Sequence, residues 1–405
     1  MTGGAPTTRT RRLRVAGRVA LGLAAAGVLA LPFALGGCRS KPDYPPNLAF
    51  PPRADRLVLR TPTVQPASTG EPGQLDAELA GLDALGGKTA DPGEVPAERR
   101  QALDAFLRDT FGTPAAPAVR GEEAAAERLG LTPERLAEGG RLFRRHCLQC
   151  HGLSGDGRGP TGLWIYPHPR DFRRGAFKFV STGDGMKPRR ADLGRTIRDG
   201  LKGTAMPAFA LLPDAERELM AAYVVYLSLR GQVEFQTLTA LLTDGEDGAD
   251  GDAAGFARDR LRRRLGEWER AESAPPPAAP PLPDDEGRQA VDYLASVRRG
   301  YELFTAAGGT GCANCHEDFG RKATYRYDVW GTVVRPADLT SGAYKGGGRP
   351  EDFAARVRSG IQPSGMPAHA ALTDAQVADL VRFVRALPYP RELPPDLRAK
   401  VYPGQ

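Results

Sequence analysis

The pentapeptide CLQCH at residues 147–151 and the pentapeptide CANCH at residues 312–316 share one pattern, two cysteines followed directly by a histidine. The chain has five cysteines, and these two copies use all of them except Cys38. On a helix, residues three positions apart lie on one face, so each copy brings two thiols together beside an imidazole. The sequence therefore contains two copies of one site.

Each copy is typical of the covalent attachment of a c-type haem. Two thiols at this spacing reach the two vinyl groups of one porphyrin, and the adjacent imidazole is placed to bind the iron. A redox dithiol, a disulfide framework and half of a zinc site are the alternatives, but two copies that use every thiol except one favour haem. We therefore predict two haem c groups, with thioether bonds from Cys147, Cys150, Cys312 and Cys315 and iron ligation by His151 and His316.

A haem iron held by histidine needs a sixth ligand in an electron carrier, and methionine is the common choice in cytochromes c. Of the five methionines, Met366 alone lies in the C-terminal half of the chain. An internal repeat identifies its counterpart, because TAMPAF at residues 204–209 matches SGMPAH at residues 364–369. We therefore predict Met206 and Met366 as the axial ligands.

The repeat extends beyond the methionine loops, since RDF at residues 170–172 matches ADL at residues 337–339. Met186 has no partner in the second copy, and Met220 lies on the apolar face of an expected helix, where a role in the core is favoured. Apolar residues spaced three or four apart predict an all-α fold. The expected helices run from Pro133 into the first pentapeptide, from Asp214 to Arg230, from Val291 to Phe304 and from Asp374 to Leu387.

These residues resemble the class I cytochromes c, in which helices wrap around one haem ligated by histidine and methionine. The resemblance implies an all-α protein with two tandem domains, each around a covalently bound haem. In that family the first and last helices cross at a small residue packed against an aromatic ring. This crossing maps onto Gly140 with Tyr223 or Tyr226, and onto Gly300 with Phe383.

The same resemblance implies that a proline carbonyl holds the proximal histidine. Pro160, in GDGRGP at residues 155–160, matches that element in the first copy, and Pro336 is a distant candidate in the second. His369 is a less favoured alternative to Met366 as iron ligand, because Phe209 holds its place in the first copy.

The N-terminus has the layout of a secretory signal, with five arginines in the first 18 residues before an uncharged, mostly apolar run at residues 19–35. The junction LGGC at residues 35–38 resembles the bacterial lipobox, in which the cysteine becomes lipidated after cleavage. This implies a lipid on Cys38 and a location in the bacterial cell envelope, with the globular part in the periplasm or outside the cytoplasmic membrane. An uncleaved anchor helix is the alternative.

The charge balance excludes nucleic-acid binding that relies on bulk charge. The net charge of +6 falls to +1, with 50 basic and 49 acidic residues, once the five N-terminal arginines are set aside. Residues 141–190 are locally basic, with eleven basic and three acidic side chains. We expect some of them (Arg170, Arg173, Arg174 and Lys178) to pair with haem propionates; for others, a docking face for an acidic partner and a plain solvated surface are equally favoured.

The 405 residues include 49 glycines and 36 prolines, about a fifth of the chain, which suggests that long stretches are linker rather than packed domain. We expect residues 39–72 to form an extended tether and the connection between the domains to be flexible, apart from a charged helical stretch at residues 256–272. A helix at residues 97–111 is expected to pack on the first domain. The predicted segments are a signal peptide (1–37), a Pro-rich tether with short helices (38–120), a first domain (121–235), an acidic and Pro-rich linker (236–285), a second domain (286–390) and a tail (391–405).

The layout is similar to dihaem membrane-associated cytochromes that exchange electrons with respiratory complexes. The favoured hypothesis is a carrier of single electrons between such complexes, whose donor and acceptor are respiratory-chain redox proteins. The alternatives are a dihaem enzyme of the peroxidase or thiosulfate-oxidising type and a fixed haem subunit of a larger oxidoreductase. A methionine at the matching position in both copies favours the carrier over the enzyme.

Overall fold

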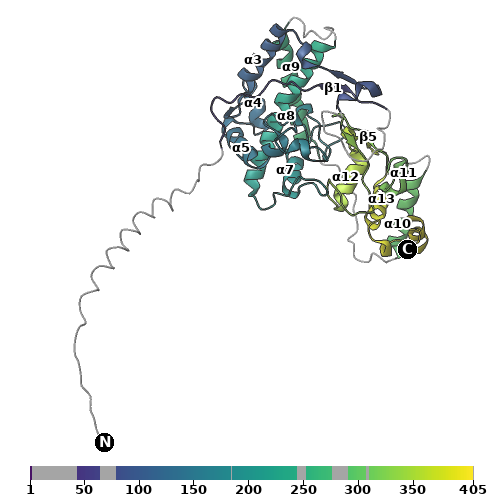
Figure 1. Cartoon of the computed structure of the whole chain (residues 1–405). Coiled ribbons are helices and arrows are strands. Elements are labelled where there is room, and N and C mark those ends of the chain that lie inside the picture. Colours follow the sequence, from purple (N-terminus) through teal and green to yellow (C-terminus); the bar gives the residue numbers. More distant parts are fainter. Residues whose placement is uncertain are drawn as a thin grey trace. The chain divides into compact units, whose positions relative to one another are not determined.

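A computed structural model describes Met1 and residues 43–63, 79–183, 185–243, 252–275, 291–306 and 310–404 (Figure 1). Helices predominate among these residues, so the all-α prediction is confirmed, and the strands form three small antiparallel pairs. The signal peptide and Cys38 lie outside the described residues. The helices are α3 (Ala97–Phe111), α4 (Glu123–Arg128), α5 (Pro133–His146), α6 (Leu148–His151), α7 (Arg190–Asp199), α8 (Asp214–Leu242), α9 (Ala253–Ser273), α10 (Val291–Thr305), α11 (Cys312–Cys315), α12 (Pro350–Ser359), α13 (Asp374–Ala386) and α14 (Pro395–Val401), and the strands are β1 (Leu57–Arg60), β2 (Lys88–Ala90), β3 (Gly112–Thr113), β4 (Ala116–Pro117), β5 (Arg326–Tyr327) and β6 (Val333–Val334).

The first domain is built on the crossing of α5 and α8. Thr132 caps α5 by accepting a hydrogen bond from the Arg135 backbone, and Pro133 occupies the first helical turn as predicted. A Cβ atom added at Gly139 would lie 2.4 Å from the carbonyl oxygen of Leu219, so Gly139 is the residue of closest approach. Gly140, the residue mapped from the family resemblance, packs against the ring of Tyr223, whose Cε2 would lie 3.0 Å from a Cβ atom there, so the predicted pairing of Gly140 with Tyr223 is confirmed.

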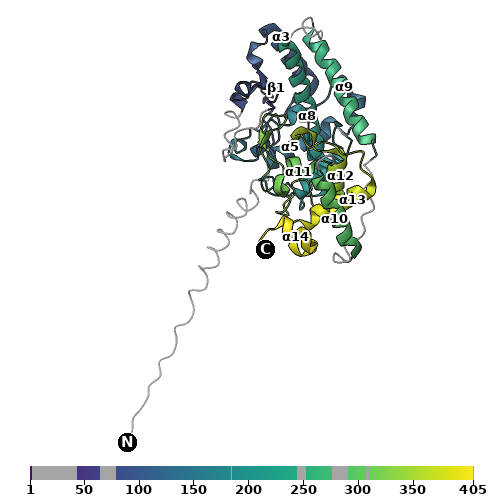
Figure 2. The ribbon, with the colours of Figure 1, turned by 90° about the vertical axis from the view of Figure 1, so that its right-hand side faces the viewer.

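The second domain repeats this crossing with α10 and α13, which lie side by side in Figures 1 and 2. A Cβ atom at Gly300 would lie 2.1 Å from the carbonyl oxygen of Asp379 and 2.7 Å from the Cβ of Phe383. The predicted pairing of Gly300 with Phe383 is therefore confirmed. The side chain of Asp379, on α13, forms an ion pair with Arg299, on α10, at 2.8 Å.

Two helices that the sequence analysis did not predict, α7 and α12, occupy matching places in the repeat. Each begins with the same cap: the backbone N–H of Arg189 donates to Asp192 at 3.1 Å, and that of Arg349 donates to Asp352 at 3.1 Å. Each leads through a glycine into a methionine loop. The duplication therefore extends further than the motifs alone indicated.

The connection between the domains is more ordered than predicted. Helix α8 continues to Leu242, twelve residues beyond the expected end at Arg230, and α9 packs against it, as Figure 2 shows. Leu261, Leu265 and Trp268 of α9 are buried. The helical stretch predicted at residues 256–272 is therefore confirmed as α9, and it is packed rather than flexible, because burial of one α9 face stabilises that helix against α8.

The N-terminal segment is packed as well. Phe50 is 7% exposed and its ring lies 6.2 Å from that of Tyr226, while β1 pairs with β2. The expected extended tether is therefore wrong over residues 44–62. Helix α3 buries Leu103, Phe106 and Leu107, so its predicted packing on the first domain is confirmed.

Residues 391–404, expected as a tail, carry α14, which adds Leu397 and Val401 to the core of the second domain. Among the described helices, none is long and apolar enough to cross a bilayer.

Candidate haem-binding sites

Both pentapeptides form one turn of helix. In α6 the backbone N–H of His151 donates to the carbonyl of Cys147 at 2.9 Å, and the matching bond runs from His316 to Cys312 at 2.8 Å. This turn places the two cysteines of each motif on one helix face with the histidine beside them. The structure therefore brings together the residues that the spacing predicted.

The glycine-rich loop at residues 155–160 forms hydrogen bonds with the backbone carbonyls at the end of the first motif. The backbone N–H groups of Gly157 and Gly159 donate to the carbonyls of His151 at 2.9 Å and Cys150 at 3.1 Å. These carbonyls end the helix and have no helical partner, so the loop supplies one. Gly157 has φ of 75°, and a Cβ atom there would lie 2.5 Å from the carbonyl oxygen of Pro169, which explains the need for glycine.

His151 is held by the backbone of Arg170. Its Nδ1 lies 3.1 Å from the Arg170 carbonyl oxygen, which can only accept, so Nδ1 donates and Nε2 carries the lone pair for a metal. The ring of Phe172 stacks on the imidazole at 4.7 Å between centroids. Burial lowers the pKa of His151 to about 4, which keeps the imidazole neutral, the form that binds iron.

His316 is held in the same way. Its Nδ1 lies 3.2 Å from the carbonyl oxygen of Ala337, and burial lowers the pKa of this histidine as well. The prolines suggested by the family resemblance, Pro160 and Pro336, are therefore not the partners. The signal was present in the repeat, because Arg170 and Ala337 begin the matched segments RDF and ADL.

The methionine loops have equivalent backbones. Each follows a glycine with positive φ, 64° at Gly200 and 67° at Gly360. The backbone N–H of Leu201 donates to the Met206 carbonyl at 3.2 Å, and that of Ile361 donates to the Met366 carbonyl at 2.9 Å. The pairing of the two methionines by the repeat thus has a counterpart in backbone geometry.

The remaining methionines lie elsewhere. Met220 is fully buried in α8, as expected for a core residue, and Met186 is 37% exposed. His369 is positioned by its backbone N–H, which donates to the Val357 carbonyl at 3.0 Å. Phe209 makes the same bond to Ile197 at 3.1 Å, so these two residues are structural equivalents.

None of the four motif cysteines forms a disulfide, so all four are available for thioether bonds. Burial raises the pKa of Cys147 to about 12, and it raises that of Cys312. Unpaired, partly buried thiols beside a neutral imidazole with a fixed tautomer are the donor set that a covalently attached haem requires. The residues present at both motifs therefore fit haem c.

The four basic residues expected near haem propionates are instead engaged with protein groups. Arg173 forms ion pairs with Asp55 at 2.7 Å and Asp171 at 2.8 Å, and Lys178 pairs with Asp328 at 3.0 Å. Arg174 donates to the carbonyl of Val58, and Arg170 covers the ring of Trp330. The side chains of Arg170, Arg173 and Lys178 are mostly buried, with exposed fractions of 24%, 4% and 15%, and these contacts are internal to the protein.

Comparison with known proteins supports the two sites. The family model described as cytochrome c oxidase, cbb3-type, subunit III matches residues 134–224 and again residues 295–384. Each match includes one pentapeptide and one methionine loop. No curated protein matches the chain. Among solved structures, a chain of the Kuenenia stuttgartiensis reducing HAO-like protein complex Kustc0457/Kustc0458 is 23% identical with a TM-score of 0.44, over 62% of this chain and 95% of that chain.

Proposed function

We propose that this dihaem c-type cytochrome, with its two covalently attached haem c groups, passes single electrons between respiratory complexes. In this proposal a lipid on Cys38 anchors the protein to the membrane. Haem c supplies a one-electron iron couple. The protein's part is to hold both axial ligands in place and to exclude other ligands from the iron.

The observation that carries the proposal is the matched pair of methionine loops. In this proposal His151 and Met206 ligate the first iron, and His316 and Met366 ligate the second. With both axial positions filled, neither iron offers an open position for a substrate, which is the arrangement of a carrier rather than of an oxygen- or peroxide-activating enzyme.

A stably docked haem subunit of a larger oxidoreductase is the second candidate, and the packed N-terminal segment favours it. The chain is already packed at Tyr44, which is 5% exposed. Tyr44 follows Cys38 by only six positions, and this stretch spans at most about 20 Å. A lipid on Cys38 would therefore keep the first domain near the membrane, where a membrane-embedded partner is accessible.

The coordination is tested by optical and magnetic circular dichroism spectra of the protein, oxidised and reduced, with and without carbon monoxide. We expect two low-spin haems per chain and no fast binding of carbon monoxide. Replacing Met206 or Met366 with alanine opens one axial position, so each variant should bind carbon monoxide at one haem and gain peroxidase activity. Met186→Leu serves as the matched control and should leave the spectra unchanged. Fast carbon monoxide binding by the wild type would instead favour the enzyme.

The anchor is tested by replacing Cys38 with alanine. Without a cysteine at the lipobox-like junction no lipid can be attached, and we expect the haem protein to move from the membrane fraction to the soluble fraction, or to remain as uncleaved precursor. Immunoblotting of the fractions with haem staining distinguishes these forms. A variant that stays in the membrane fraction at its mature length would argue against the lipid.

A further inference from the structure

A hairpin of the second domain inserts into the first domain. Strands β5 and β6 pair through Arg326 with Val334 and Tyr327 with Val333, and the turn between them carries Trp330, which is 6% exposed. Asp328 organises this turn, since its Oδ1 accepts hydrogen bonds from the backbone N–H groups of Trp330 and Thr332 at 3.1 Å each. Trp330 is therefore presented on a constrained turn.

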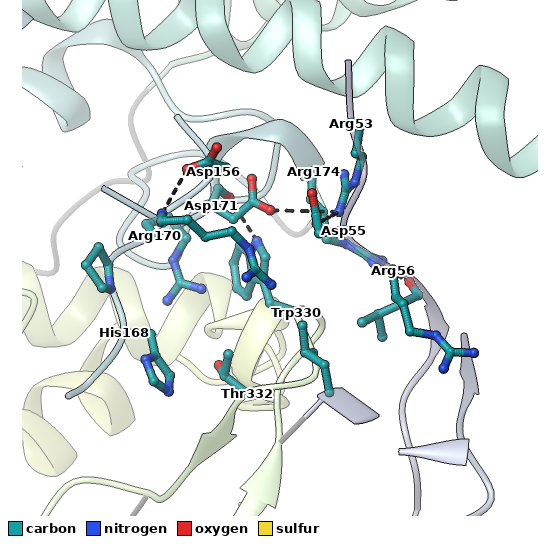
Figure 3. A pocket seen from close by; sticks show the side chains of 14 residues that line it. Arg53, Asp55, Arg56, Asp156, His168, Arg170, Asp171, Arg174, Trp330 and Thr332 are labelled. Atoms are coloured by element: carbon teal, nitrogen blue, oxygen red, sulfur yellow. Dashed lines mark hydrogen bonds and ion pairs between the residues drawn. The ribbon is translucent and has the colours of Figure 1, made fainter. Parts of the chain in front are cut away.

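Trp330 contacts the loop that follows the first haem motif. Its Nε1–H donates to the carbonyl oxygen of Asp171 at 2.9 Å, and the guanidinium of Arg170 lies 3.5 Å from the ring centroid. Figure 3 shows Trp330 beneath Arg170 and Asp171 at the edge of a cavity lined also by the N-terminal segment. The indole thus engages two consecutive residues of one loop.

Charge reinforces the same contact. The side chain of Asp328 is fully buried, and its Oδ2 lies 3.0 Å from Lys178 Nζ and 3.7 Å from Arg170 Nη1. Breaking a buried pair of this kind is costly, because a charge is left without a partner. The hairpin is therefore held against this loop by an ion-pair cluster as well as by the indole.

The loop that Trp330 engages is also the one that holds His151. The carbonyl of Arg170 accepts the hydrogen bond from His151 Nδ1, one peptide unit from the carbonyl that accepts from Trp330. We propose that Trp330 is a positioning residue for the first haem: by fixing the Arg170–Asp171 segment, it keeps the Arg170 carbonyl aimed at His151. The inference rests on His151 as the ligand of the first iron.

The chemical consequence is a change in reduction potential. A hydrogen bond from the second ring nitrogen raises the basicity of a ligating imidazole and fixes its orientation. A more basic ligand stabilises the oxidised iron, so loosening this bond raises the potential. The second domain would therefore tune the first haem through contact alone.

The test compares Trp330→Phe, which keeps a ring beneath Arg170 but lacks the N–H, with Trp330→Ala, which removes both contacts. Trp164→Phe is the matched control, because Trp164 lies in the first domain with 77% of its surface exposed. Spectroelectrochemical titration gives both potentials, and electron paramagnetic resonance gives the ligand geometry at each low-spin iron. The redox wave that shifts in the Met206→Ala variant belongs to the first haem, and the other wave belongs to the second.

We expect the potential of the first haem to rise in Trp330→Phe and to rise further in Trp330→Ala, with changed resonance positions for that haem and an unchanged second haem. Unchanged potentials in both folded variants would overturn the inference, as would equal shifts at both haems, which indicate a global effect. A wild-type first haem without a histidine ligand by resonance would overturn the ligand assignment itself, and the inference with it.

Discussion

Replacing Gly300 with alanine is expected to destabilise the second domain by about 3 kcal/mol or more. The new methyl group would lie 2.1 Å from the Asp379 carbonyl oxygen and 2.7 Å from the Cβ of Phe383, so α10 and α13 would have to separate. Both obstacles belong to backbone or to the first atom of a side chain, and neither can rotate away. The helix-forming advantage of alanine over glycine, about 1 kcal/mol, is smaller than this cost.

Thermal unfolding followed at the haem absorption bands measures the effect, together with limited proteolysis of the second domain. Gly139→Ala should destabilise the first domain in the same way, because its methyl group would lie 2.4 Å from the Leu219 carbonyl oxygen. At Gly194, in α7, a methyl group would meet no atom within 4 Å, so Gly194→Ala should stabilise by about 0.5–1 kcal/mol. Equal stability of Gly300→Ala and wild type would disprove the close crossing.

The haem motifs and the framework helices could be predicted because their signals are local. Pro133 after Thr132 predicts where α5 begins, and the apolar spacing from Asp374 to Leu387 comes within one residue of the end of α13. The repeat paired Met206 with Met366 without any knowledge of the fold. The helix ends depend on neighbouring residues, and the methionine pairing depends only on comparing two segments of one sequence.

The hydrogen-bond partners of the two haem-motif histidines were harder to predict. The family resemblance pointed to Pro160, whereas the structure uses the Arg170 carbonyl, nineteen residues after His151. Backbone carbonyls are present at every residue and have no side-chain signature. Only the alignment of residues 170–172 with 337–339 could have identified both carbonyls.

The connecting segments were misjudged for a different reason. Proline and glycine at the ends of α9 suggested flexibility, but Trp268 and Leu265 are buried within a hydrophobic cluster that includes residues of α8 and α3. Likewise, Arg53 follows four prolines within eight residues, yet its side chain is 4% exposed. Composition describes a segment in isolation, and burial against a distant helix is not visible in it.

The second large loss of stability is expected when an ion-pair network that includes Arg53 is broken. Asp55 lies between two buried guanidinium groups, with Arg53 at 2.9 Å and Arg173 at 2.7 Å. Arg173 binds it through both terminal nitrogens. Replacing Asp55 with alanine leaves these two cations short of a partner, and we expect a loss of about 3–5 kcal/mol in the free energy of unfolding of the first domain.

Denaturant unfolding at pH 7 measures this loss, and Asp199→Ala is the control, because the Arg198–Asp199 pair is 45% and 49% exposed and should contribute about 1 kcal/mol or less.

Burial opposes ionisation of Asp55, but Arg173 and Arg53 outweigh it and hold the pKa of Asp55 well below its usual range. As the pH falls, Asp55 therefore binds a proton in the unfolded chain, near pH 4, before it does so in the folded chain. The stability that Asp55 contributes is complete above about pH 4 and is lost as the pH falls toward the folded-state pKa. The wild-type protein should thus lose stability on acidification more steeply than Asp55→Ala, and parallel pH profiles for the two would show that the network does not stabilise the fold.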